Sequence, residues 1–250
     1  MAPGPGQRSR SRQRPQQRIN RDLEALETWV PRTKLGMKVK AGEITSVEEI
    51  LSLNLTVQEP QIVDFILREN LESELILIGQ AKGKFGGGAR RPFKHTQKKV
   101  REGARLKFSY VAVVGNRDGL VGLGRGSSRS SVPARQRAVA NAKLNMIRVP
   151  RACGSWECGC SGPHSIPAKV EGKCGSVRVT LLPAPKGIKL AINDESKKIL
   201  ELAGVKDVWS KTTGQTRSRT NLANATFDAL RNLHLIKYQN EYVESAGVVL

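Results

Sequence analysis

Apolar positions with a helical period predict a set of short helices over residues 22–72. Ser46, followed three residues later by Glu49, matches a capping box that opens one helix. Pro60 occupies a favourable first position for another helix, where its missing N–H would have no partner in any case. The apolar stripe that follows consists of Ile62, Val63, Ile66 and Leu67. This segment also holds most of the acidic residues of the N-terminal half, so we expect it to pack against protein.

Strand and helix patterns over residues 73–150 predict a first α+β domain. Asn116-Arg117-Asp118-Gly119 is a turn signal between two strands of a hairpin, with Gly119 available for a positive φ. A helix is predicted over residues 131–147, with Pro133 in its first turn. Its inward stripe comprises Ala134, Ala138, Ala142 and Met146. The strands predicted for this domain are residues 75–81, 110–114 and 120–124.

A second α/β domain is predicted over residues 166–238, and residues 239–250 are expected to form a short tail. Gly204 is a suitable residue to end the first helix of this domain, and Thr220 is a suitable N-cap for the last one. The predicted strands are 176–182, 188–192 and 205–209, and the predicted helices are 195–203 and 221–235. The fold class predicted for the chain is therefore α+β.

The net charge narrows the class of partner. The chain has 42 Lys and Arg against 22 Asp and Glu, which gives +20 at pH 7. So many uncompensated positive side chains repel one another and oppose compaction unless an anion neutralises them. The phosphate backbone of a nucleic acid is the obvious candidate. No long apolar run or basic amphipathic helix indicates a membrane. Residues 1–21 are rich in arginine and contain no acid, so we expect either a disordered tail that orders on RNA or a solvated one.

Basic residues are densest between residues 82 and 107, where ten of them accompany a single acid, Glu102. Three consecutive glycines followed by Arg90 and Arg91 predict a flexible basic loop that runs to Lys99. Aromatic residues make up only 4% of the chain. We therefore expect RNA contacts that are electrostatic and follow shape, rather than a surface that stacks bases on rings.

Three of the four cysteines lie within eight residues and precede a histidine; the set is Cys153, Cys158, Cys160 and His164. Three thiolates and one imidazole are a complete tetrahedral ligand set for a structural zinc ion, so residues 151–165 are predicted to form a zinc-binding loop. The alternative is a loop of free thiols in which His164 binds RNA or caps a strand. Without an apolar signal segment at the N-terminus, we expect a reducing compartment and no disulfides. Cys174 is expected to be a buried thiol.

Two ordered series of motifs carry a family resemblance over roughly residues 75–235. The first comprises Val113-Val114-Gly115, Gly119-Leu120-Val121-Gly122-Leu123-Gly124, Val132-Pro133-Ala134 and Ala142-Lys143. The second comprises Val170-Glu171-Gly172-Lys173-Cys174-Gly175-Ser176-Val177, Pro183-Ala184-Pro185, Leu202-Ala203-Gly204-Val205 and Ala225-Thr226-Phe227-Asp228-Ala229-Leu230. They resemble the N- and C-terminal domains of the ribosomal protein S5 family. Lys186-Gly187-Ile188-Lys189 departs from the Gly-Thr-Gly-Ile stretch usual there.

The N-terminal segments are similar to those of archaeal and eukaryotic members. These segments are Trp29-Val30-Pro31, Thr33-Lys34-Leu35-Gly36 and Ile62-Val63-Asp64-Phe65. The resemblance implies a double-stranded-RNA-binding-like domain first. A C-terminal domain of order β-α-β-β-α with a left-handed crossover follows. It also implies a cytoplasmic, structural component of the small ribosomal subunit, of archaeal type, that supports subunit assembly.

The resemblance further implies two groups of RNA-binding residues. The group expected on ribosomal RNA is Arg90, Arg91, Lys98, Lys99, Arg101, Gly103, Arg105 and Lys107. The group expected toward the messenger RNA entry channel is Arg125, Arg129, Arg135 and Arg137. There, such residues would help to unwind messenger RNA and support accurate decoding, beside neighbouring proteins of the S3, S4 and S8 families. The expected effect of removing one charge is a uniform loss of affinity with strong salt dependence.

Two other classes of function are alternatives to the ribosomal one. A free double-stranded-RNA-binding module would bind many duplexes in isolation and be mostly absent from ribosomes. An RNA-processing enzyme would need a carboxylate pair or a phosphate-binding loop, and neither is visible in the sequence. His95 and His234 have no carboxylate or nucleophile partner in the sequence. We therefore expect no enzyme activity and no small-molecule substrate.

Overall fold

In the computed structural model of the protein, residues 28–80 and 90–249 are described. The expectations for the tail at 1–21 and for the triple glycine lie outside the described residues. Within them, the N-terminal extension consists of α2 Lys34–Ala41, α3 Val47–Ser52, α4 Pro60–Leu67 and the 3₁₀ turn η1 Arg68–Asn70. The Ser46 hydroxyl accepts a hydrogen bond from the Glu49 N–H, and Pro60 is the first residue of α4, as predicted.

The extension packs against the first domain through charges as well as apolar contacts. The Lys143 ammonium lies 2.5 Å from an Asp64 carboxylate oxygen, and both side chains are mostly buried. Arg148 pairs with Glu48 at 3.2 Å. A buried apolar cluster between the two parts contains Val47, Val63, Leu120 and Met146. The expectation that this acidic segment packs against protein is thus met within the chain itself.

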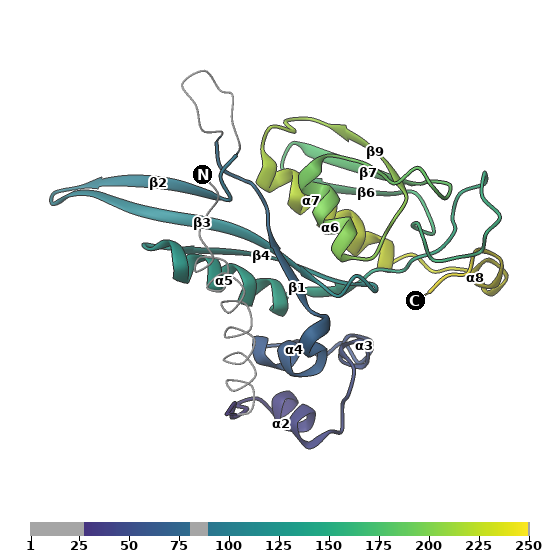
Figure 1. Ribbon diagram of the computed structural model, residues 1–250, viewed down its shortest axis with the longest axis horizontal. Helices are drawn as coiled ribbons and strands as arrows, with labels where there is room; N and C mark the ends of the chain where they lie inside the picture. Colours follow the sequence, from purple (N-terminus) through teal and green to yellow (C-terminus); the bar gives the residue numbers. More distant parts are fainter. Residues whose placement is uncertain (1–27, 81–89, 250) are drawn as a thin grey trace, which may run out of the picture.

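The first sheet is antiparallel, in the order β1-β3-β4-β5, and β2 pairs with the outer part of β3. Its strands are β1 Glu72–Leu75, β2 Phe93–Val100, β3 Gly103–Gly115, β4 Leu120–Ser128 and β5 Met146–Arg148. The turn before β4 is the one predicted, with the Asn116 side-chain oxygen accepting from two backbone N–H groups and Gly119 at φ 92°. The outer parts of β2 and β3 extend away from the body as an arm (Figure 1).

Helix α5, Ser131–Leu144, covers one face of this sheet (Figure 1). The predicted inward residues Ala134, Ala138 and Ala142 are fully buried. The prediction of a helix as far as residue 147 is wrong. Met146 belongs to β5 instead, because the Asn145 side chain turns back to donate to the Leu123 carbonyl and the chain then pairs with β4.

Two further sequence predictions for this domain need correction. The strand predicted over 75–81 ends at Leu75, the last residue of β1. The segment that runs to Lys99, predicted as a basic loop, forms strand β2 from Phe93 onward. Only Arg101 and Glu102 turn the chain between β2 and β3. From Phe93 onward, the residues predicted as a flexible basic loop are instead part of an extended two-stranded β-ribbon.

The second domain is a four-stranded sheet in the order β6-β7-β9-β8, with two helices packed on one of its faces (Figure 1). Its elements are β6 Val170–Cys174, β7 Val177–Pro183, β8 Leu190–Ala191, α6 Asp194–Leu202, β9 Val208–Thr213 and α7 Arg219–His234. Only β8 and β9 are parallel, joined through α6. The α+β class is confirmed, while the order within this domain is β-β-β-α-β-α rather than β-α-β-β-α. Helix α7 begins after Ser218, not after Thr220.

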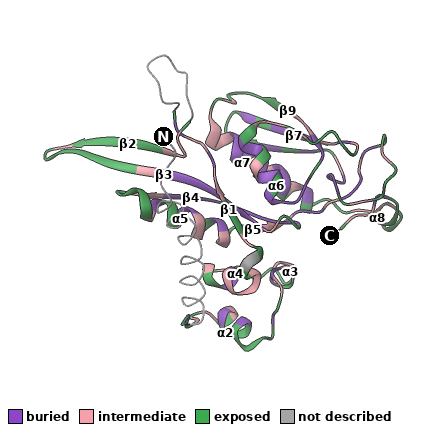
Figure 2. Ribbon diagram, viewed as in Figure 1, coloured by how far each residue is buried: buried purple, intermediate pink, exposed green. Residues whose placement is uncertain are grey.

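The two domains share one apolar core. Val111, Val113 and Leu123 on the sheet face opposite α5 belong to the same buried cluster as Leu200 and Phe227 of the second domain. Figure 2 shows this buried region between the sheet and α7, in contrast to the exposed arm. The predicted tail at 239–250 contains a further helix, α8 Asn240–Ala246. The Cys153 N–H donates to the Ala246 carbonyl, so this helix packs beside the cysteine loop.

Candidate nucleic-acid interface and metal site

The register of β2 and β3 divides the arm into two chemically different faces. Side chains alternate between faces along a strand, and residues that pair across two strands share a face. Lys98 pairs with Arg105, Thr96 with Lys107, and Lys94 with Ser109. We call this set the basic face; its charged members are Lys94, Lys98, Arg105 and Lys107.

The basic face carries charge that the described protein does not neutralise. Lys94, Lys98 and Lys107 make no ion pair within the part of the chain that the structure describes. Arg105 has only the exposed Glu102, at 3.7 Å, and an exposed pair of that kind contributes little. Lys98 stands directly opposite Arg105, an arrangement of like charges that destabilises an isolated ribbon. The face is therefore suited to a polyanion.

The other face of the arm carries rings and an apolar side chain. Phe93 pairs with Tyr110, His95 with Phe108, and Gln97 with Leu106. We call the set Phe93, His95, Leu106 and Phe108 the aromatic face. This face lies on the same side of the sheet as α5. Along β3, Tyr110 and Ala112 point to the same side as Phe108, and both pack against Ala134 and Ala138 of α5.

The residues expected on ribosomal RNA do not all lie together. Lys98, Arg105 and Lys107 share the basic face, but Lys99 lies on the side of the aromatic face. Arg101 and Gly103 are at the tip, and Arg90 and Arg91 are at the base of the arm, where the Gly79 N–H donates to the Arg91 carbonyl. Lys94 was missed by the sequence prediction. Its signal was its position four residues before Lys98, which places both side chains on one face of a strand.

The second predicted group is also divided between the two sides of the sheet. Arg125 pairs with Val111 and so lies on the side of the basic face. Arg129 follows β4, while Arg135 and Arg137 are exposed on α5, with Arg137 donating to the Ser127 carbonyl at 3.2 Å. The four arginines therefore present two surfaces rather than one.

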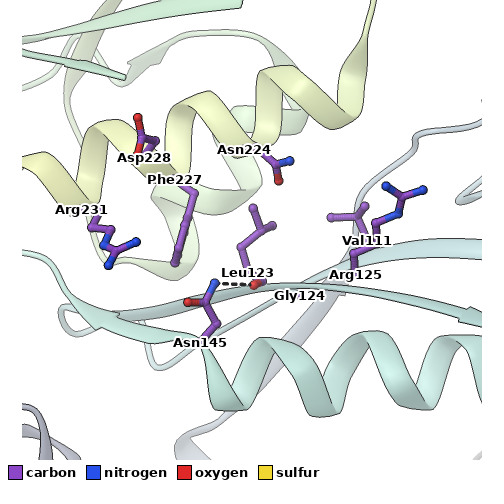
Figure 3. Close-up of a pocket in the computed structure, with 9 residues that line it drawn as sticks. All are labelled: Val111, Leu123, Gly124, Arg125, Asn145, Asn224, Phe227, Asp228 and Arg231. Carbon is purple, nitrogen blue, oxygen red and sulfur yellow. Dashed lines mark hydrogen bonds between the residues drawn. The ribbon is translucent and has the colours of Figure 1, made fainter. Parts of the chain in front are cut away.

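A cavity of about 330 Å³ lies between the first sheet and α7 (Figure 3). Its apolar wall contains Val111, Leu123 and Phe227, and Arg125 and Arg231 are exposed at its rim. The Asp228 carboxylate at this site already accepts the Lys173 N–H. None of the nine lining residues is a histidine, cysteine or serine, so the cavity offers no nucleophile and general base pair. Arg231, which sequence reasoning did not select, extends the basic surface across the domain boundary.

The structure brings the four predicted metal ligands together. One ligand atom from each of Cys153, Cys158, Cys160 and His164 lies within 4.8 Å of all the others. The Cys160 and Cys153 sulfurs are 3.6 Å apart, and the Cys158 sulfur is 3.8 Å from His164 Nε2. Tetrahedral bonds of zinc length separate two ligand atoms by roughly 3.6–3.8 Å. The cluster therefore fits a tetrahedral metal ion.

Asp207 holds the histidine of this cluster. Its carboxylate lies 3.0 Å from His164 Nδ1, and both side chains are buried. A proton on Nδ1 that is donated to the carboxylate leaves Nε2 free to bind a metal, which is the usual arrangement around a metal-bound histidine. The other Asp207 oxygen accepts the N–H groups of Gly187 and Lys189. Asp207 could not be selected from the sequence, because it is 43 positions from His164.

Hydrogen bonds make one thiol of the cluster unusually acidic. The backbone N–H of Lys186, together with the contacts from Cys160 and Cys153, lowers the pKa of Cys158 to about 6. Burial raises the pKa of the Cys153 thiol. Cys174, expected to be a buried thiol, is half-buried at the end of β6. A thiolate at Cys158 near neutral pH is the form that binds metal.

Together these features define a basic α+β protein with a surface for a polyanion and a cysteine cluster of structural type. Residues 93–150 match the family Ribosomal protein S5, N-terminal domain, and residues 172–241 match Ribosomal protein S5, C-terminal domain. The chain belongs to the ribosomal protein S5 family.

Similar proteins from several archaea cover nearly the whole chain. The small ribosomal subunit protein uS5 of Nanoarchaeum equitans is 47% identical over 222 residues, which are 89% of this chain and 95% of that protein. The same protein of Methanocaldococcus jannaschii is 44% identical over 224 residues, 90% and 96% of the two chains. That of Methanospirillum hungatei is 48% identical over 209 residues, 84% and 94%. The archaeal resemblance expected from the sequence is confirmed.

The family is one of ribosomal proteins, and the chain is not an enzyme. Among the described helices, none is long and apolar enough to cross a lipid bilayer.

Proposed function

We propose that the chain is a structural protein of the small ribosomal subunit in the cytoplasm, where its basic face binds ribosomal RNA. The single observation that carries this proposal is the unneutralised basic face on a projecting arm, in a chain whose relatives are named as small-subunit proteins. In this role the two bodies at 73–150 and 166–238 anchor in folded RNA and support subunit assembly. The residues proposed on ribosomal RNA are Arg90, Arg91, Lys94, Lys98, Lys99, Arg101, Gly103, Arg105 and Lys107.

Removal of two opposing charges from the arm tests the proposal. K98Q/R105Q should weaken binding of the purified chain to small-subunit ribosomal RNA about tenfold or more at moderate salt, and should lower the salt slope by nearly two. The matched control is K169Q/K197Q, which also removes two charges, each already within 3.8 Å of a glutamate oxygen. Equal effects of the two double variants would rule out the arm as the RNA contact.

We further propose that Arg129, just before α5, and Arg135, in its first turns, reach messenger RNA near its entry channel, with Arg125 and Arg137 close by. Support comes from their exposure, and from Arg137 bracing the end of β4. Neighbours of the S3, S4 and S8 families would share this region. Small subunits reconstituted with R129Q/R135Q should unwind messenger RNA hairpins more slowly and misread more often than subunits with K169Q/K197Q. Unchanged rates in both assays would exclude the role.

The cysteine cluster is proposed to hold one structural zinc ion. Cys153, Cys158, Cys160 and His164 would supply all four ligands, leaving no position for water or substrate. Elemental analysis of the purified chain should give about one zinc per chain, and C160S should lose it. C174S is the matched control, because Cys174 lies outside the cluster and should keep the metal. Metal-free protein after purification without chelators would contradict this assignment.

A further inference from the structure

The arm has a second face whose rings have no role in phosphate binding. On the aromatic face, Phe108 is 5.7 Å from Phe93 and 6.4 Å from His95, measured between ring centroids. Phe93 in turn lies 5.7 Å from Tyr110. The half-buried rings of Phe93 and Phe108 thus pack beside the exposed ring of His95 and hold it in place.

The outer part of this face is open. Helix α5 covers the sheet only as far out as Tyr110, whose hydroxyl lies 2.5 Å from Ser131 Oγ at the first residue of the helix. Beyond that point His95 is exposed and Leu106 is 41% exposed. An apolar side chain beside an exposed ring, on a ribbon only two strands wide, has little value for folding and indicates a contact surface.

The charge around this face selects the class of partner. Between residues 90 and 110 the chain has eight Lys and Arg and one acid, Glu102. Lys99 lies on the same side as the rings, and the basic face is on the reverse of the same ribbon. A protein partner would have to be both apolar and strongly acidic to fit. RNA offers both chemistries at once, since it has phosphates and, where unpaired, bases with exposed π faces.

We propose that the aromatic face binds an unpaired nucleobase of the ribosomal RNA, which stacks on the His95 ring while Leu106 contacts its edge. The arm then contacts RNA on both sides, with phosphates on the basic face and a base on the aromatic face. This proposal rests on the proposed function of the arm, and it locates base stacking in a chain whose low aromatic content predicts none. The register of β2 and β3 brings the rings of Phe93, His95, Phe108 and Tyr110 together at this one place.

Stacking and phosphate contact differ in their salt dependence, which separates the two proposals. H95A should weaken binding of the purified chain to small-subunit ribosomal RNA by about fivefold or more, with the salt slope unchanged. H95F should restore the affinity, because phenylalanine keeps a ring without the imidazole nitrogens. His95 is exposed, so neither substitution should change stability measurably.

The possible outcomes distinguish the two proposals clearly. If K98Q/R105Q has no effect on RNA binding, the proposed function of the arm fails. If K98Q/R105Q weakens binding but H95A does not, only the stacking proposal is overturned. A photoreactive amino acid in place of Leu106 should crosslink to an unpaired nucleotide in intact small subunits. A crosslink to a protein, with RNA affinity unchanged by H95A, would assign the face to a protein neighbour instead and also overturn the stacking proposal.

Discussion

At the scale of single residues, Gly124 decides how closely α5 approaches the sheet. A Cβ at this position would overlap the backbone of Ala138, Asn141 and Ala142. Gly124→Ala should therefore lower the free energy of unfolding by about 1–3 kcal/mol, because neither the strand nor the helix backbone can move freely aside. Chemical denaturation measures this. Gly159→Ala is the matched control, since nothing lies within 4 Å of its Cβ; equal losses would contradict the explanation.

Glu59, the residue before α4, accepts hydrogen bonds from Trp29, Arg32 and Thr33 and so connects residues 29–33 to this helix. Burial alone would raise the pKa of its carboxyl, but hydrogen bonds from Thr33, the Arg32 N–H and Trp29 outweigh burial and lower this pKa. A group with a lowered pKa in the folded state stabilises above its unfolded pKa, and this stabilisation is lost as pH falls through the folded value.

The Glu59→Gln substitution should therefore destabilise the protein most near neutral pH. The difference in unfolding free energy from the unchanged chain should shrink as pH falls below about 4.5, the ordinary value for this carboxyl. Denaturation curves at a series of pH values measure this difference. If the difference in unfolding free energy stays constant down to pH 3, the charge of the Glu59 carboxylate has no part in its hydrogen bonds to residues 29–33.

At the scale of elements, α8 holds the cysteine loop in place. The Ser161 hydroxyl donates to the Ser245 carbonyl at 2.9 Å, and the Tyr242 hydroxyl donates to Pro167 at 2.5 Å. A chain that ends at Gln239 should lose protection against hydrogen exchange at the Cys153 N–H, whose acceptor is the Ala246 carbonyl. Amides in β7 serve as the internal control. Unchanged exchange at Cys153 would mean that α8 is dispensable for the loop.

Several elements with a buried face were predictable from the sequence, but not all of them: β6 was missed although Val170 is buried. Helix α5 follows from its alanine stripe, and β7 from alternation at Val177, Val179 and Leu181. Strand β2 was missed because six of its eight residues are exposed, so no apolar alternation marks it. Its structure comes from pairing with β3, which sequence periodicity does not record. The end of α5 was missed because Met146 continues the stripe although Asn145 ends the helix.

The residues of the cysteine cluster could be predicted from spacing, whereas the groups that support them could not. Cys153, Cys158 and Cys160 are close in sequence, so local chemistry identifies them. Asp207 and the N–H of Lys186 come from the second domain and meet the cluster only after folding. The same distinction holds for the arm, where composition identified the charge and only the register of the strands divided it into two faces.

At the scale of the whole molecule, charge should govern affinity for RNA. Residues 1–21 contain six arginines and no acid. Their removal should lower the salt slope of binding to small-subunit ribosomal RNA by about four to five if all six meet phosphates. Filter binding over a range of salt concentrations measures this slope. A slope that is unchanged by the truncation would mean that the tail stays in solution when the protein binds.

The core shared by the two domains has a consequence for the newly made protein. Synthesis completes the first sheet once Arg148 has been added, yet Val111, Val113 and Leu123 then have no cover. Their cover arrives only with the second domain, first with Leu200 on α6 and later with Phe227 on α7. Until the second domain has been synthesised, the N-terminal half therefore exposes an apolar face of its sheet. Binding to a chaperone, or early incorporation into a growing subunit, would protect it from aggregation.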